Sequence, residues 1–102
     1  MIEVRKTEVF AVWFAALRDR EARIRIQVRI DRLAMGNPGQ HRVLTGGVCE
    51  MKIDHGPGYR VYYARHGDAW VVLLCAGSKK TQNADINAAL ALAKELEHSH
   101  GP

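Results

Sequence analysis

The sequence predicts an α+β fold in which helices pack mainly on one face of an antiparallel β-sheet. Apolar residues recur at helical spacing in two stretches before residue 36, which indicates two helices near the N-terminus. Between residues 42 and 76 they alternate with polar residues or run continuously, as in strands joined by short turns. Helical spacing returns from about residue 83. The predicted order is therefore strand, two helices, three or four strands and a C-terminal helix.

The first part of the chain predicts one strand and one helix. Residues 2–5 alternate between apolar and charged side chains, as a short strand does. Thr7 then offers a hydroxyl that can cap a helix, and the large apolar residues after it share one helical stripe. These residues are Val9, Phe10, Trp13, Phe14 and Leu17. The helix is expected to end near residues 18–20.

A second helix is predicted from about residue 20 to residue 35, with Asp19 as its cap and Gly36 as its stop. Residues 23–31 also alternate with a period of two and would suit a strand, but a longer helical stripe favours the helix. Its members are Ala22, Ile26, Ile30 and Leu33. The helix would expose a series of arginines, which is either a solvated helix face or a contact for RNA or DNA. The series consists of Arg18, Arg20, Arg23, Arg25, Arg29 and Arg32.

The strands that follow form a meander. After a short strand at residues 42–44, side chains alternate along residues 48–54, and the members expected to face the core are Cys49, Met51 and Ile53. The opposite face then carries Glu50, Lys52 and Asp54. Residues 59–65 return antiparallel with one shared face formed by Arg60, Tyr62 and Ala64. Residues 69–76 are the most apolar strand, and the last helix is predicted to bury Ile86, Ala89, Leu90, Ala93 and Leu96.

Length and composition limit the class of protein. The 102 residues, 47% of them apolar, suffice for one domain spanning residues 1–102. Lys and Arg number 15 against 11 Asp and Glu, and the net charge of +4 favours an acidic partner without identifying it. Cys49 and Cys75 lie in strand patterns, as buried thiols of a reducing compartment do. No run approaches the ~18 apolar residues of a membrane span, so we expect a cytoplasmic protein with no membrane partner.

Four cations are predicted to gather at one end of the sheet. Lys79 and Lys80 leave the apolar strand. Arg60 begins the strand before it, and Lys52 lies across the hairpin from Arg60. Cations held together by a rigid sheet repel one another unless a nearby carboxylate or an anionic ligand offsets them. Phosphate is the natural ligand for such a cluster.

The cluster suggests chemistry on a phosphodiester. Cations could stabilise the added negative charge of a pentacoordinate transition state, and a lysine could transfer a proton. Tyr59, Tyr62 or Tyr63 could stack on an unpaired base. Catalysis, nucleic-acid binding without chemistry and ordinary surface charge are the interpretations that the residues leave open.

Other site types are disfavoured. His55 follows Asp54 in a turn, where a solvent-exposed histidine is the simpler interpretation than a general base. Cys49 and Cys75 occupy apolar positions at which a thiolate nucleophile would be costly. The Gly56-Pro57-Gly58 turn lacks the Gly-Lys-Ser/Thr ending of a phosphate-binding P-loop. We expect no metal site and no cofactor.

Three segments together resemble a known family. They are residues 47–53, residues 56–63 with Gly58-Tyr59-Arg60, and residues 73–82 with Lys79-Lys80-Thr81-Gln82. In these segments the chain is similar to the RelE/ParE superfamily of bacterial type II toxins, and most to its HigB-like branch, the addiction module killer proteins. The resemblance implies two N-terminal helices and a C-terminal helix packed on an antiparallel sheet.

The resemblance implies an endoribonuclease that cleaves messenger RNA in the ribosomal decoding site without a metal. In this reaction the ribose 2′-hydroxyl attacks the adjacent phosphate. The resemblance implies that Arg60 binds the phosphate and that Lys80 stabilises the leaving group or the phosphate. Lys52 would accept a proton, and Glu50 is the alternative residue for that role. Further RNA contacts are expected from Glu50, Tyr59, Lys79, Thr81 and Gln82. The last helix lacks the histidine or aromatic residue that some relatives use, so no general acid is identified.

The resemblance also implies partners. A cognate antitoxin protein would cover the basic face, messenger RNA and the ribosome would be the targets, and DNA would be bound by the toxin–antitoxin complex. Two other functions remain open from the sequence. One is a ParE-like poison of DNA gyrase without enzymatic activity, because fold alone does not fix function. The other is a structural module that binds nucleic acid.

Overall fold

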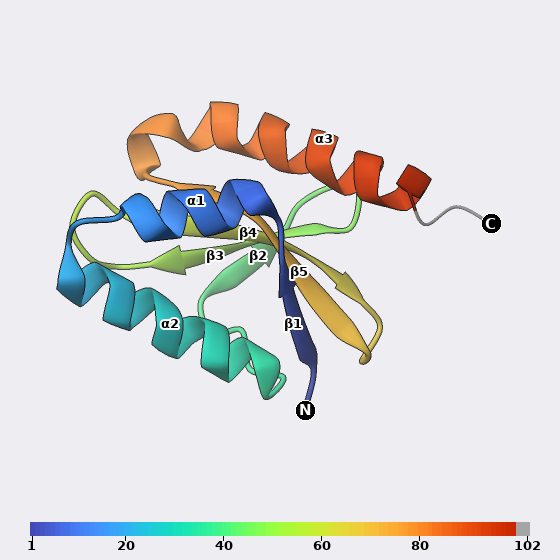
Figure 1. The fold of residues 1–102 in the computed structure, drawn as a ribbon, viewed down its shortest axis with the longest axis horizontal. Helices are drawn as coiled ribbons and strands as arrows, with labels where there is room; N and C mark the ends of the chain where they lie inside the picture. The colour runs from blue at the N-terminus through green and yellow to red at the C-terminus, as the bar shows by residue number, and fades with distance from the viewer. Residues whose placement is uncertain (100–102) are drawn as a thin grey trace.

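The computed structural model describes residues 1–99 of the chain as an α+β fold built on a five-stranded mixed sheet (Figure 1). None of its described helices is long and apolar enough to cross a membrane. The elements in chain order are β1 (Glu3–Lys6), α1 (Glu8–Ala16), α2 (Arg20–Ala34), β2 (His41–Val43), β3 (Val48–Ile53), β4 (Tyr59–His66), β5 (Trp70–Gly77), the 3-10 turn η1 (Lys79–Thr81) and α3 (Gln82–Ser99).

Both N-terminal helices begin at side-chain caps. The Thr7 hydroxyl accepts a hydrogen bond from the Phe10 amide at 3.1 Å, and Asp19 accepts one from the Ala22 amide at 3.1 Å. Thr7 also donates to the Leu74 carbonyl at 2.6 Å, which fixes the start of α1 against β5. The predicted stripe of α2 is buried, so the helix rather than the strand is confirmed over the stretch that alternates with a period of two.

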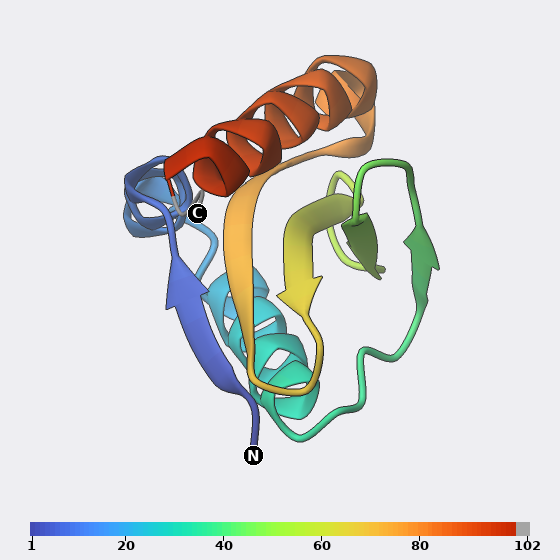
Figure 2. The ribbon, with the colours of Figure 1, turned by 90° about the vertical axis from the view of Figure 1, so that its right-hand side faces the viewer.

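The sheet has the strand order β1-β5-β4-β3-β2, with β1 and β2 at its two edges (Figure 2). Strands β2 to β5 pair antiparallel, as predicted, but β1 pairs parallel with β5. The prediction of a wholly antiparallel sheet is therefore wrong at this edge. A parallel pair needs a long connection, and here the two helices and three strands between β1 and β5 supply it.

Helices cover both faces of the sheet, so the prediction that they pack mainly on one face is also wrong. Residues of α1 and α2, such as Phe10 and Ile26, share one core cluster with Met51 and Leu73. The other face forms a second cluster in which α3 packs on Tyr62, Val72 and Leu74, among others. Strand β5 is buried along Val71–Gly77, so its apolar side chains on both faces have to be covered.

The end of β5 is packed tightly against the start of α3. A Cβ atom added at Gly77 would lie 1.8 Å from Oδ2 of Asp85 and 2.8 Å from Oγ1 of Thr81. These two side chains already form a hydrogen bond, in which the Thr81 hydroxyl donates to Asp85 at 2.6 Å. Glycine at this position therefore lets the chain leave the sheet in contact with α3, and it sets the course of residues 79–82.

We predict that Gly77→Ala lowers the free energy of unfolding by about 1–3 kcal/mol, because the added methyl group displaces the Asp85 carboxylate from Thr81. Urea denaturation followed by circular dichroism measures the change. A double variant with Asp85→Ala should recover part of the loss, since the nearest clashing atoms are then absent. An unchanged denaturation midpoint in Gly77→Ala would show that the contact relaxes at no cost.

Candidate functional site

A groove opens on the face of the sheet where β2, β3, β4 and the start of α3 meet. Its cavity has a volume of about 380 Å³. The structure brings four of the predicted site residues together here, along with three from the segment leading through β2. The complete lining is Gln40, His41, Arg42, Glu50, Lys52, Arg60 and Gln82.

Arg60 is buried in the groove wall with only 6% of its surface exposed. Its Nη1 donates to the Gly58 carbonyl at 2.7 Å, whereas its buried Nε has no hydrogen-bond partner. Among the described residues no carboxylate forms an ion pair with this guanidinium. A buried charge without a partner is costly, and an anion that occupies the groove would supply the missing partner.

Lys52 lies directly opposite Arg60 in the antiparallel pair of β3 and β4. Residues paired in this way present their side chains on the same face of the sheet, and like charges placed there repel each other. Lys52 is half-buried and, like Arg60, has no ion-pair partner among the described residues. The groove therefore holds two neighbouring cations whose repulsion a bound anion would relieve.

Glu50 does not neutralise these cations, because both of its oxygens are bound elsewhere. Oε1 accepts from Nε of Arg42 at 2.7 Å, and Oε2 accepts from Nε2 of Gln82 at 2.8 Å. Burial by itself would raise the pKa of Glu50, but these hydrogen bonds outweigh burial and the pKa is lowered. The ionised carboxylate thus connects β2 to the start of α3 across the sheet.

The tyrosines predicted as stacking platforms do not line the groove. Tyr62 and Tyr63 are buried at 0% and 2% exposure, which makes the prediction of base stacking wrong for both. Burial, followed by the nearby Glu50 carboxylate, raises the pKa of Tyr62, so its hydroxyl stays protonated. Tyr59 packs edge-on against Trp13, with 5.9 Å between the ring centroids. Both rings pack against the core cluster under α1 and α2, on the face of the sheet opposite the groove.

Lys79, Lys80 and Thr81 are exposed on η1, outside the groove lining. The Lys79 amide donates to the Pro57 carbonyl at 3.4 Å, so η1 lies beside the turn between β3 and β4. Of the four cations predicted to gather, the groove itself contains two. Lys79 lies at the groove margin beside this turn, and Lys80 follows it on η1.

Arg29 has a role that the sequence did not reveal. It was grouped with the exposed arginines of α2, yet it is half-buried and donates to three backbone carbonyls. Nη1 reaches Lys52 at 2.5 Å, and Nη2 reaches Pro38 at 3.0 Å and Gln40 at 2.9 Å. Burial lowers its pKa, followed by repulsion from Arg32. Arg29 therefore holds the segment before β2 against β3, at the rim of the groove.

The segment from Gln40 to Arg42 was also missed as part of the site. Register explains how it contributes: Arg42 lies opposite Glu50, while His41 lies opposite Met51, whose side chain faces the core under α2. His41 borders the groove, but by this register it does not share the face of Lys52 and Arg60. Its Nδ1 is 2.8 Å from the Gly39 carbonyl and, since a carbonyl only accepts, this nitrogen donates.

The residues disfavoured for chemistry lie elsewhere. His55 is 3.0 Å from the Asp19 carboxylate at the start of α2, away from the groove. Burial raises the pKa of the Cys75 thiol to about 12 and also raises that of Cys49, and both cysteines are free. Among the side chains that the structure describes, no group of three from His, Cys, Asp or Glu is placed to hold a metal ion.

Comparison with known proteins gives a family match and a related protein. The sequence profile of a family described as "Phage derived protein Gp49-like (DUF891)" matches residues 12–96, a range that includes every residue of the groove lining. An "Uncharacterized protein" of Haemophilus influenzae is 41% identical to the chain over 95 residues, which cover 93% of this chain and 96% of that protein.

The Glu50 contacts predict a pH-dependent contribution to stability. A pKa lowered from 4.5 means that ionised Glu50 stabilises the fold above that pH, and that this stabilisation is lost as the pH falls through the folded value. We expect Glu50→Gln to cost about 1–3 kcal/mol near neutral pH, because its amide would face that of Gln82. The cost should shrink when urea denaturation is repeated in acid. Glu97→Gln, an exposed position on α3, is the control and should show no such trend.

The Arg29 contacts predict a larger effect than other arginines of the same helix. Arg29→Ala should lower the free energy of unfolding by about 2 kcal/mol, since three carbonyls lose a charged donor. Arg25→Ala, one turn earlier and paired only with exposed Glu21, should cost less than about 0.5 kcal/mol. Urea denaturation gives both values, and amide hydrogen exchange at Lys52 should accelerate only in Arg29→Ala. Equal losses of stability in Arg29→Ala and Arg25→Ala would contradict the proposed role of the three Arg29 hydrogen bonds.

Proposed function

The chain belongs to the Gp49-like family of phage-derived proteins, and we propose that it is a toxin of a type II toxin–antitoxin system that cleaves messenger RNA without a metal ion. The observation that supports this most is the buried guanidinium of Arg60 in the groove, with an unpartnered Nε and Lys52 directly opposite. A phosphodiester of RNA supplies the anion that these cations lack. The sequence resemblance to HigB-like toxins of the RelE/ParE superfamily and the α+β fold agree with this proposal.

The proposed reaction is an attack within the RNA strand. The ribose 2′-oxygen forms a bond to the adjacent phosphorus and the bond from phosphorus to the 5′-oxygen breaks, which leaves a 2′,3′-cyclic phosphate and a 5′-hydroxyl. A base takes the proton of the 2′-hydroxyl, and the 5′-oxygen gains one. Negative charge on the phosphate oxygens grows in the transition state, and guanidinium and ammonium groups fixed beforehand by the sheet stabilise that charge.

The contacts in the groove support a division of roles. Arg60 binds the phosphate, and Lys52 is the side chain that takes the proton of the 2′-hydroxyl, a step for which its ammonium group must first release a proton to solvent. Glu50 is a weak base because both oxygens accept hydrogen bonds and its pKa is lowered, so we assign it to positioning Arg42 and Gln82. The first turns of α3 carry neither histidine nor tyrosine, and we assign the proton for the 5′-oxygen to solvent.

Residues at the groove margin fit contacts to the flanking RNA. Lys79 and Lys80 are exposed beside the turn that precedes Arg60, where they can bind phosphates next to the scissile one. We therefore propose that Lys80 binds the phosphate backbone next to the leaving group. Cleavage on the ribosome would arrest translation in the cytoplasm, and a cognate antitoxin that covers the groove would prevent it.

We predict that Arg60→Ala lowers RNA cleavage by a factor on the order of 100 to 1,000, because a transition-state charge loses its buried partner. The measurement is mapping of messenger RNA 5′ ends after incubation of the protein with translating ribosomes. Arg65→Ala is the matched control: this arginine lies on the same strand but is exposed and paired with Asp68, so cleavage should be unchanged.

Three results would contradict the proposed function. The first is undiminished cleavage by Arg60→Ala, which would remove the groove from the reaction. The second is growth arrest with intact messages and gyrase-dependent DNA breaks, as expected of a ParE-like poison. If induced expression leaves growth, messages and DNA unchanged, the protein is a binding module and the proposed cleavage is wrong.

A further inference from the structure

The outward face of α2 carries apolar side chains where a solvated helix carries polar ones. Ile24 is 58% exposed and Val28 is 40% exposed. They are four residues apart and so lie on one face, opposite the buried stripe that contains Ala22 and Ile26. The buried stripe already satisfies the packing of α2 on the sheet. The fold therefore leaves 58% of Ile24 and 40% of Val28 exposed, and this apolar surface points to a partner outside the fold.

Two hollows adjoin these side chains. One, of about 680 Å³, lies between the end of α1 and the start of α2 and is lined by Phe14, Ile24 and three arginines. The other, of about 320 Å³, lies between α2 and the end of β3 and includes Ile24, Val28 and Ile53. Because Ile24 belongs to both, the hollows form one neighbouring surface, which we call the α2 surface.

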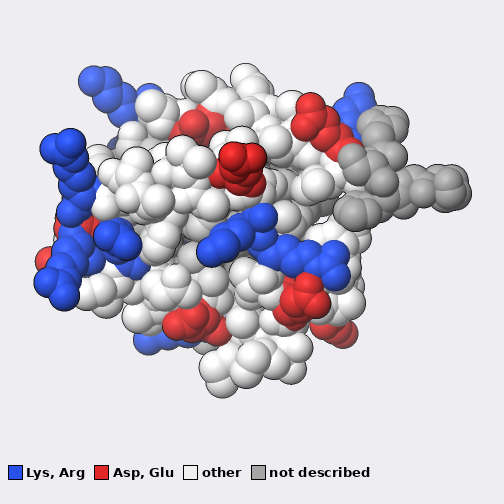
Figure 3. Space-filling model, in the orientation of Figure 1, with Lys and Arg blue, Asp and Glu red and all other residues white. Residues whose placement is uncertain are grey.

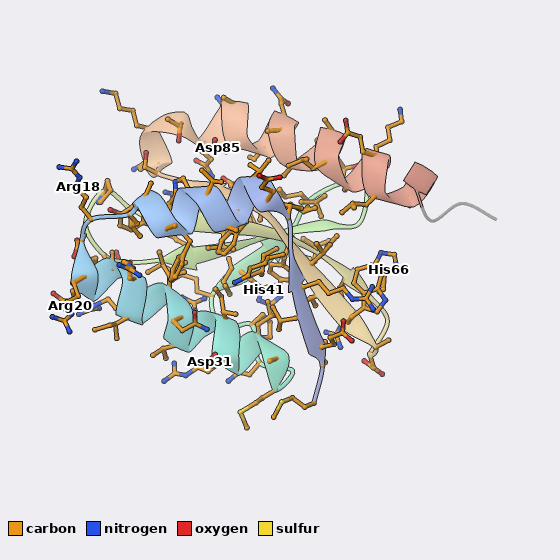
Figure 4. All side chains as sticks on the ribbon, viewed as in Figure 1. Arg18, Arg20, Asp31, His41, His66 and Asp85 are labelled. Atoms are coloured by element: carbon orange, nitrogen blue, oxygen red, sulfur yellow. The ribbon has the colours of Figure 1, made fainter. Side chains whose placement is uncertain are left out.

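Cations surround the apolar centre of the α2 surface. Arg18 and Arg20 project outward at the turn between α1 and α2, where Figure 3 shows Lys and Arg gathered at one end of the molecule (Figures 3 and 4). Among the described side chains, none forms an ion pair with Arg18, Arg20, Arg23 or Arg32. Arg23 lies over the ring of Phe14 at 5.7 Å. Asp54 is the carboxylate that lines the second hollow. Glu21, on the same helix, is already paired with Arg25 and does not neutralise the other arginines.

We propose that the α2 surface binds an acidic amphipathic helix of a partner protein. The apolar pair runs along the axis of α2, so a second helix laid beside it can bury an apolar stripe of its own. Acidic residues flanking that stripe would meet the unpaired arginines, and this charge complementarity selects an acidic partner. RNA fits less well, since isoleucine and valine offer neither a stacking ring nor a hydrogen bond to a base.

This surface is separate from the groove, and its proposal does not depend on RNA cleavage. No residue that lines the α2 surface also lines the groove. Lys52 and Arg60 line the sheet face that α3 partly covers, whereas α2 packs on the other face. Arg29 borders the second hollow and also holds the rim of the groove, so the test leaves it unchanged, and a failure of the groove chemistry would leave this binding unaffected.

The test uses the full chain and a fluorescent designed peptide, a helix with leucine at every third or fourth position and glutamate elsewhere. Fluorescence anisotropy measures its affinity, and methyl NMR shifts of Ile24 and Val28 locate it. Replacing both residues by serine should weaken binding about tenfold or more. A lysine version of the peptide should bind weaker by a similar factor, as should the acidic peptide to Arg32→Glu.

The matched control is the pair Val9→Ser and Val12→Ser on α1. These valines are 50% and 61% exposed, but α1 contains no lysine or arginine, so peptide affinity should change less than about twofold. Urea denaturation confirms that both double variants remain folded. Equal losses in the two pairs, absence of binding, or displacement of the peptide from these methyl groups by single-stranded RNA would each overturn the proposal.

Discussion

The need to cover β5 on both faces is the constraint on which the rest of the structure depends. Residues Val71 to Gly77 are all buried, and their side chains are divided between two separate core clusters. No single layer of helices can satisfy such a strand. The chain therefore places α1 and α2 on one face and returns α3 to the other, through a turn that only a glycine at position 77 allows without a clash.

The groove follows from the incomplete cover that α3 provides. Helix α3 packs on Tyr62, Val72 and Leu74 near the middle of the sheet. Its first residue, Gln82, donates a hydrogen bond to Glu50. Beyond this contact, Lys52 and Arg60 lie on the same sheet face without apolar cover. The Arg60 side chain keeps a fixed orientation at this margin, because it is buried and its Nη1 donates to the Gly58 carbonyl. Its Nε has no hydrogen-bond partner and remains available to a ligand.

Sequence patterns predicted the local elements well because each follows from periodicity. The strand alternation around Met51 and the helical stripe of Ile26 placed the correct faces toward the core. Contacts between distant segments were not predictable in this way. The parallel pairing of β1 and the clamp of Arg29 on three carbonyls depend on tertiary packing, which no short pattern encodes. The same limit explains why Arg42, on a strand of only three residues, was missed.

The alternation in α2 that would suit a strand gains a physical meaning from the structure. A helix can bury only one of its faces on the sheet, so Ile26 is buried while Ile24 is left outside. The sequence thus contains more β-branched apolar residues than the fold uses. Cations in the groove are enclosed and oriented, whereas those around Ile24 are exposed and border apolar surface. Enclosed cations suit a small, fixed anionic group, and exposed ones suit the charged flanks of a partner helix, so the two proposals assign the excess positive charge of the chain to two kinds of recognition.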